Sequence, residues 1–159
     1  MSKLEKLITS LSKKKLTLAV AESCSGGYAS YLLTKIPGSS KVFKGGVIVY
    51  SLDTKTKLFK ISPSLLAKTQ GISKEVAASL AKGVKKRFKS SIGASIVGFA
   101  GPTAKKGTKV GTTFIAIDYK DKTMIEEAII KGDRDTVRRK VSAFLINLLY
   151  ERFITNKPS

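Results

Sequence analysis

The sequence predicts one α/β domain over residues 1–159, with a mixed, mostly parallel sheet between two layers of helices. Three short apolar runs are separated by segments of helical periodicity, which is typical of parallel strands joined by crossover helices. Two further strand-like runs near the C-terminus are separated only by a short turn, which predicts an antiparallel pair. The length of 159 residues falls within the usual size of a single domain.

The first half of the chain alternates between helices and strands. Residues 3–14 carry Leu at helical spacing and predict a short amphipathic helix. "LTLAVAES" (16–23) is typical of a buried strand, and "GGYASYLLTK" (26–35) predicts a helix that ends before Pro37. "VFKGGVIVYS" (42–51) predicts a second strand, in which the Gly pair indicates a bulge or a close backbone approach.

The second half contains the longer helices and the last three strands. Residues 53–61 predict a short helix, and residues 73–89 predict a longer one that Ser73 caps. "GASIVGFAG" (93–101) is a third buried strand, and residues 110–119 and 124–132 are two strands around the turn "KDK". The C-terminal helix covers 133–153, and we expect residues 154–159 to fray.

The composition restricts the possible chemistry. The chain has no His, which excludes a Ser-His-Asp triad, a Cys-His pair and any His-based metal site. It has one Cys, so neither an internal disulfide nor a thiolate zinc cluster can form. Any catalysis must therefore use Ser, Cys, Lys, Tyr, Asp, Glu or Arg, backbone donors, or a metal held by oxygen atoms.

The net charge of +19 raises the question of nucleic-acid binding. The basic residues are mostly Lys spread along the chain, and no basic stripe carries interleaved aromatic residues, so we do not expect a nucleic-acid partner. A positive field also favours small anionic substrates such as phosphates. The N-terminus lacks the apolar core of a secretory signal, and no apolar stretch reaches the ~18 residues of a membrane span. We therefore expect a cytoplasmic protein without a membrane partner.

Polar or glycine-rich stretches follow each of the first three strands: "ESCSGG", "YSLDTK" and "GFAGP". In open α/β sheets, ligands bind beyond the carboxyl ends of the strands, so these stretches are expected to meet at one site. The glycines of "ESCSGG" permit a tight turn, and the helix after them presents N–H groups that could hold a phosphate or an oxyanion.

Two nucleophiles compete in this turn. Ser23 and Cys24 are adjacent, so in extended backbone their side chains would point to opposite faces. Spacing alone leaves open a structural interpretation, in which Ser23 caps the helix and Cys24 is a core residue.

Without His, a serine nucleophile needs another base. A Lys amine can serve when burial lowers its pKa. "YSLDTK" supplies Lys55 as that base and Tyr50 to relay or orient the proton, although most lysines are simple surface charges. Arg134 starts the last helix and could clamp a phosphate. The alternative is that Asp133 caps the helix and Arg134 is solvated.

Several blocks occur in a compatible order: "AESCSGG", "IPGSSKVFKGGVIVYSLDTK", "GISKEVA", "GFAGPT", "KVGTTFIAI" and "GDRDTVRRK". Over residues 4–152 they resemble the CinA C-terminal domain family, whose characterised activity is nicotinamide mononucleotide deamidase. The N-terminal nucleotide-pyrophosphatase-like domain of full-length members is not expected in this chain. The resemblance implies hydrolysis of the nicotinamide amide to the acid and ammonia, with no metal or organic cofactor, and a protein that self-associates.

The resemblance also implies roles for individual residues. The family serine falls on Ser23, the family lysine on Lys55 and the family tyrosine on Tyr50. The arginine of "GDR" falls on Arg134, on the substrate phosphate side. The other residues of these blocks that we expect to line the substrate site are Glu22, Ser25, Gly26, Gly27, Ser40, Gly46 and Gly101.

The chain departs from the family pattern next to the expected site. The family's "YSNEAK" reads "YSLDTK", so Leu52 replaces an amide side chain, and the Gly pair that follows the family's "GIAGP" block is missing after Pro102. These changes could redirect or abolish activity, since a polar group left unpaired costs ~1–3 kcal/mol. The alternative function is a catalytically weak or inactive nucleotide-binding module linked to competence or DNA damage.

Overall fold

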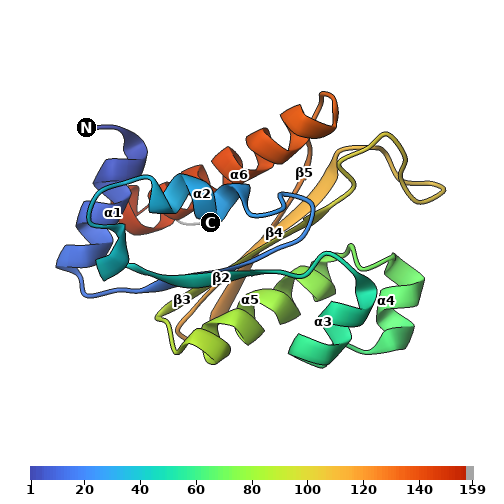
Figure 1. Ribbon diagram of the computed structural model, residues 1–159, viewed down its shortest axis with the longest axis horizontal. Helices are drawn as coiled ribbons and strands as arrows, with labels where there is room; N and C mark the ends of the chain where they lie inside the picture. The colour runs from blue at the N-terminus through green and yellow to red at the C-terminus, as the bar shows by residue number, and fades with distance from the viewer. Residues whose placement is uncertain (157–159) are drawn as a thin grey trace.

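The computed structural model describes residues 1–156, which form a five-stranded sheet in the order β2-β1-β3-β4-β5 (Figure 1). The strands β1, β2 and β3 are parallel to one another, and β4 is antiparallel to both β3 and β5. The mixed, mostly parallel sheet predicted from the sequence is thereby confirmed. The strands are β1 (Leu18–Glu22), β2 (Phe43–Ile48), β3 (Ile92–Gly98), β4 (Thr112–Tyr119) and β5 (Lys122–Ile129).

Helices cover both faces of the sheet, as expected for a three-layer arrangement (Figure 1). One face carries α1 (Lys3–Lys13), α2 (Tyr28–Thr34) and α6 (Arg134–Tyr150). The other carries α3 (Leu52–Phe59), α4 (Pro63–Thr69) and α5 (Lys74–Phe88). Because each face of the sheet is covered, residues 1–156 form two hydrophobic clusters rather than one.

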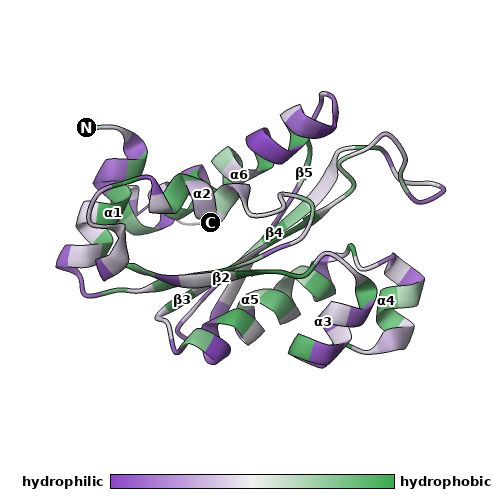
Figure 2. Ribbon diagram, viewed as in Figure 1, coloured by the Kyte–Doolittle hydropathy of each residue, from purple (hydrophilic) through white to green (hydrophobic). Residues whose placement is uncertain are grey.

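The alternation of side chains along β1 supplies both clusters. Leu18 and Val20 face the α1–α2–α6 layer, while Ala19 and Ala21 face the layer of α5. Successive side chains of a strand point to opposite faces, so a strand that is apolar throughout is buried on both sides. Figure 2 shows hydrophobic residues along α5 and along the later turns of α6, with hydrophilic residues gathered in the first turns of α6.

Two elements differ from the sequence prediction. Helix α4 was not expected; it begins at Pro63 after the capping residue Ser62, whose hydroxyl accepts from the N–H of Leu65. Residues 154–155, expected to fray, belong to a π-helical turn (η2, Glu151–Thr155) that extends α6 and buries Phe153. Asn156 follows this turn in a left-handed conformation, and residues 157–159 of the predicted end lie outside the described residues.

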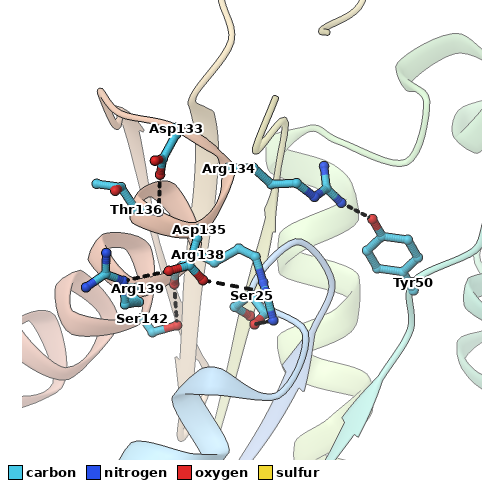
Figure 3. Close-up of polar contacts among 9 residues, drawn as sticks. All are labelled: Ser25, Tyr50, Asp133, Arg134, Asp135, Thr136, Arg138, Arg139 and Ser142. Atoms are coloured by element: carbon cyan, nitrogen blue, oxygen red, sulfur yellow. Dashed lines mark hydrogen bonds and ion pairs between the residues drawn. The ribbon is translucent and has the colours of Figure 1, made fainter. Parts of the chain in front are cut away.

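The topology brings several segments to one end of the sheet, which we call its carboxyl edge. The carboxyl ends of β1, β2 and β3 lie there together because these strands are parallel. The strand β5 runs in the same direction, so α6, which follows it, begins at that edge too. Asp133 caps α6 by accepting a hydrogen bond from the N–H of Thr136 at 2.8 Å (Figure 3).

Candidate active site

Glu22, the last residue of β1, organises the turn that follows. Its side chain is fully buried and accepts hydrogen bonds from the hydroxyls of Ser25 and Ser30 at 2.6 Å. It also accepts from the backbone N–H groups of Gly27, Ala29 and Ser30 at 2.8–3.1 Å. The carboxylate therefore caps the first turn of α2 and neutralises the partial positive charge at that terminus.

This contact corrects one expectation. The sequence suggested that the N-terminus of α2 offers free N–H groups for a phosphate or an oxyanion. The N–H groups of Gly27, Ala29 and Ser30 instead donate to Glu22, so they are not free to bind an anion. The Glu22 carboxylate points toward the N-terminus of α2, and Glu22 does not line the pocket beside Ser23 and Lys55 that is described below.

Ser23 and Lys55 meet at the end of β1, although they lie far apart in the sequence. The Lys55 Nζ donates a hydrogen bond to the Ser23 Oγ at 3.2 Å and a second one to the carbonyl of Val49 at 2.7 Å. The Ser51 hydroxyl caps α3 by accepting a hydrogen bond from the N–H of Thr54. Because α3 begins at Leu52, Lys55 lies at the end of its first turn. A Cβ atom on Gly71 would come within 2.7 Å of the Leu52 Cδ2, whereas the Lys55 methylene carbons would lie at an ordinary contact distance of 3.5 Å.

Lys55 is the only Lys among the fully buried large side chains of residues 1–156, with 2% of its surface exposed. Burial penalises the charged ammonium and lowers the pKa of Lys55 from 10.5 to about 8. A Lys amine with such a pKa is neutral in a useful fraction of molecules near neutral pH. When neutral, it has a lone pair that can accept the Ser23 hydroxyl proton.

Burial makes the Cys24 side chain less reactive, whereas it makes the Lys55 amine a better base. Its side chain is 5% exposed and belongs to the α1–α2–α6 cluster. Burial raises the pKa of its thiol to about 12, so the thiolate that would attack a carbonyl is not available near neutral pH. Between the two nucleophiles that the sequence left open, geometry and ionisation favour Ser23.

Tyr50 and Arg134 form a second pair at the same edge (Figure 3). The Arg134 guanidinium donates one hydrogen bond to the Tyr50 hydroxyl and another to the carbonyl of Gly101 at 2.5 Å. Arg134 is thus not simply solvated, even though Asp133 caps the helix as the alternative interpretation held. Within residues 1–156 no hydrogen bond joins the Tyr50 hydroxyl to Ser23 or Lys55. This arrangement gives no support to a proton relay through Tyr50.

A hollow of about 260 Å³ connects these groups, and we call it the first hollow. Its cationic side chains are Lys55 and Arg134, and no carboxylate of the described residues lines it. An anionic ligand would therefore find charge complementarity there. The lining residues are Ser23, Cys24, Tyr50, Lys55, Gln70, Ile72, Gly98, Phe99, Ala100, Gly101, Thr103 and Arg134.

Of the remaining residues expected at the site, Gly101 alone lines the first hollow. Ser25 is buried under Glu22, and Arg138 approaches its carbonyl at 3.4 Å (Figure 3). Gly26 and Gly27 have positive φ angles of 59° and 96° and form the tight turn. They shape the site rather than face it.

Gly46 and Ser40 lie elsewhere. Gly46 sits in β2 where a Cβ atom would come within 2.7 Å of the Ser30 Oγ, so its absence of a side chain lets α2 approach the sheet. Ser40 is exposed in a 3-10 turn (η1, Ser39–Lys41) just before β2, at the amino end of the strand. The structure therefore does not bring Ser40 to the first hollow.

Gln70 lines the first hollow and was missed by the sequence analysis. It ends α4 in a left-handed conformation with φ of 53°. Ser62-Pro63 indicates where α4 begins, but that the helix ends at Thr69 and so places Gln70 at the first hollow is seen only in the structure. Leu52, which stands where the family pattern has an amide side chain, packs over Gly71 and does not line the first hollow.

Residues 1–156 contain no cluster of three or more His, Cys, Asp or Glu side chains suited to holding a metal ion. None of the helices in this part of the chain is long and apolar enough to cross a membrane.

The fold and the site define an α/β protein with a buried Ser–Lys pair at the carboxyl edge of a mixed sheet. The CinA C-terminal domain matches residues 1–153, nearly the whole described chain. The chain belongs to this family.

Curated relatives and solved structures agree with that assignment. A CinA-like protein of Gemmatimonas aurantiaca is 36% identical over 148 residues, covering 92% of this chain and 35% of the relative. A CinA-like protein of Myxococcus xanthus is 38% identical over 142 residues, covering 87% of this chain and 33% of the relative. The chain thus spans about a third of the length of these relatives.

Among solved structures, the competence-damaged protein (CinA) superfamily protein of Escherichia coli superposes with a TM-score of 0.88 at 27% identity. The alignment covers 93% of this chain and 87% of that one. A CinA superfamily protein of Klebsiella pneumoniae gives a TM-score of 0.90 at 22% identity, over 98% of this chain and 99% of its own, and supports the fold alone.

Proposed function

We propose that this chain is an amidohydrolase that converts nicotinamide mononucleotide and water into nicotinic acid mononucleotide and ammonia. The observation that carries the proposal is the buried Lys55 amine, 3.2 Å from the Ser23 hydroxyl and with a pKa lowered to about 8. A base with a pKa near the working pH combines availability with proton-transfer strength. The family resemblance supplies the substrate.

In the proposed reaction, neutral Lys55 takes the Ser23 proton as the Oγ attacks the amide carbon. The resulting oxyanion requires a donor, and the backbone N–H of Cys24, next to the nucleophile, is the candidate. The Lys55 ammonium then gives this proton to the amide nitrogen, the C–N bond breaks, and ammonia leaves behind an ester on Ser23. Water, activated by the same amine, hydrolyses this ester and releases the acid.

Arg134 and Tyr50 are assigned to substrate binding. The Arg134 guanidinium is planar, carries several donors and suits a phosphate. Its hydrogen bonds to Tyr50 and to the Gly101 carbonyl orient it at the rim of the first hollow. The reaction as proposed needs no metal or organic cofactor and is expected to take place in the cytoplasm, in a protein that self-associates.

The test is ammonia release from nicotinamide mononucleotide, with nicotinamide riboside as the substrate that lacks the phosphate. Turnover of the mononucleotide, with a much larger KM for the riboside, would support the proposal. Binding of the mononucleotide by calorimetry without ammonia release would favour the alternative function as a nucleotide-binding module. Neither binding nor turnover would refute both.

A further inference from the structure

A second hollow of about 350 Å³ lies beside the first. Ile72 and Phe99 line both hollows, so the two meet across these side chains. The same two segments continue from one hollow into the other. The end of α4 contributes Gln70 to the first and Thr69 to the second, and the loop between β3 and β4 contributes Thr103 and Lys105 in the same way.

The loop between β3 and β4 and the end of α4 line both of these adjacent hollows, which we together call the cleft. The loop between β3 and β4 (yellow) projects beyond the end of the sheet, on the side where α4 lies (Figure 1). The Lys105 ammonium donates a hydrogen bond to the carbonyl of Lys68 in α4, which ties the loop to the helix. An ammonium has three N–H donors, so Lys105 can still bind an anion.

The second hollow combines an apolar floor with a cationic rim. Phe99, Phe114 and Ile129 provide aromatic and aliphatic surface, whereas Lys105 and Lys109 provide positive charge. The carboxylate that lines it, that of Glu127, is 3.5 Å from the ammonium of Lys74, which offsets its charge. A flat heteroaromatic ring joined to a phosphate matches this lining, because the ring can stack on Phe and the phosphate can pair with Lys.

The volumes point to a ligand that occupies both hollows. Ligand sites usually have volumes of roughly 300–1,000 Å³, and the first hollow, at about 260 Å³, lies below that range on its own. Taken together, the two hollows lie well inside it. In the binding mode proposed above, with the amide at Ser23 and the phosphate at Arg134, a mononucleotide has no group assigned to the second hollow.

We propose that the cleft accepts a pyridine dinucleotide, with the amide at Ser23 and the second nucleotide in the hollow lined by Lys105 and Lys109. This inference rests on the proposed amidase function. The reaction is the same hydrolysis: water replaces the amide nitrogen of nicotinamide adenine dinucleotide, giving the corresponding acid and ammonia. Only the length of the substrate differs.

The test compares kcat/KM for nicotinamide adenine dinucleotide and for the mononucleotide in three proteins. These are the wild type, the double variant K105A/K109A and the control K106A, which removes an exposed Lys of the same loop that lines neither hollow. The double variant should lower kcat/KM for the dinucleotide about tenfold and for the mononucleotide by less than about threefold. K106A should leave both values unchanged.

The proposal is overturned if the enzyme deamidates the mononucleotide but neither hydrolyses the dinucleotide nor is inhibited by it at millimolar concentration. An equal effect of K106A and of the double variant would also overturn it. If no amide is hydrolysed at all, the amidase function fails, and calorimetry with adenosine monophosphate tests the second hollow separately. Binding that K105A/K109A weakens and K106A does not would support that hollow as a nucleotide site, and no binding would reject it.

Discussion

The lowered pKa of Lys55 makes a specific prediction about pH. With a pKa of about 8, roughly a tenth of the molecules carry a neutral amine at pH 7, and about nine tenths do at pH 9. With the ordinary value of 10.5, the neutral fraction at pH 7 would be about 0.03%. Burial of Lys55 therefore increases the available base about 300-fold at neutral pH.

The assay is kcat/KM for ammonia release from nicotinamide mononucleotide between pH 7 and pH 10. This parameter reports the pKa of the free enzyme's essential base. We expect a rise of about tenfold between pH 7 and pH 9, followed by a plateau, because the base is active when deprotonated. A profile that is flat over this range, or one that keeps rising about tenfold per unit up to pH 10, would refute the assignment of Lys55 as a base with a lowered pKa.

A matched variant separates the base from the charge. Lys55→Arg keeps a positive side chain, but a guanidinium has a pKa above ~12 and cannot accept the Ser23 proton. We expect kcat to fall by about 10²–10⁴-fold, the usual contribution of general base catalysis. Retention of more than a tenth of the activity would mean that Lys55 contributes charge rather than proton transfer.

Three further predictions follow from the contacts around the site. Lys55→Met should abolish turnover, yet it should raise the free energy of unfolding at pH 7 by about 1 kcal/mol in urea denaturation, because it removes a buried charge. The wild type should become more stable as the pH rises from about 8 to 10.5, because over this range the unfolded state still binds the Lys55 proton and the folded state does not. Glu22→Gln should cost about 3 kcal/mol in the same assay, because the amide cannot accept all the hydrogen bonds that cap α2; a loss below 1 kcal/mol would contradict this role. Tyr50→Phe should raise KM about tenfold and change kcat by less than about threefold, since the hydroxyl contacts Arg134; a large fall in kcat at constant KM would instead return Tyr50 to proton transfer.

The sequence predicts the sheet and most of the helices because strand and helix periodicities are both clear in it. The segment that becomes α4 was missed because "PSLLAKT" is too short to show a helical repeat. Its start signal, Ser62 followed by Pro63, is present in the sequence, but the same dipeptide also favours a turn.

The site was only partly accessible to sequence reasoning. The pattern of strand ends suggested that Ser23 and Lys55 would meet, and the structure places them in hydrogen-bond contact. The burial of Lys55 has no local signature, because it depends on how α3 packs against segments distant in the sequence, among them the turn that holds Ser23. The role of Glu22 has no local signature either. Its position at the end of a strand allows the carboxylate to line the site or to cap the next helix, and only the structure shows that it caps α2.

The most direct test of the account is ammonia release from nicotinamide mononucleotide by Ser23→Ala beside Cys24→Ala. The two variants change adjacent residues, and each removes a single heavy atom from the side chain. The account predicts that Ser23→Ala has no turnover above background, while Cys24→Ala keeps kcat within about threefold once shown to be folded. An active Ser23→Ala protein, or a folded but inactive Cys24→Ala protein, would contradict the assignment of Ser23 as the nucleophile.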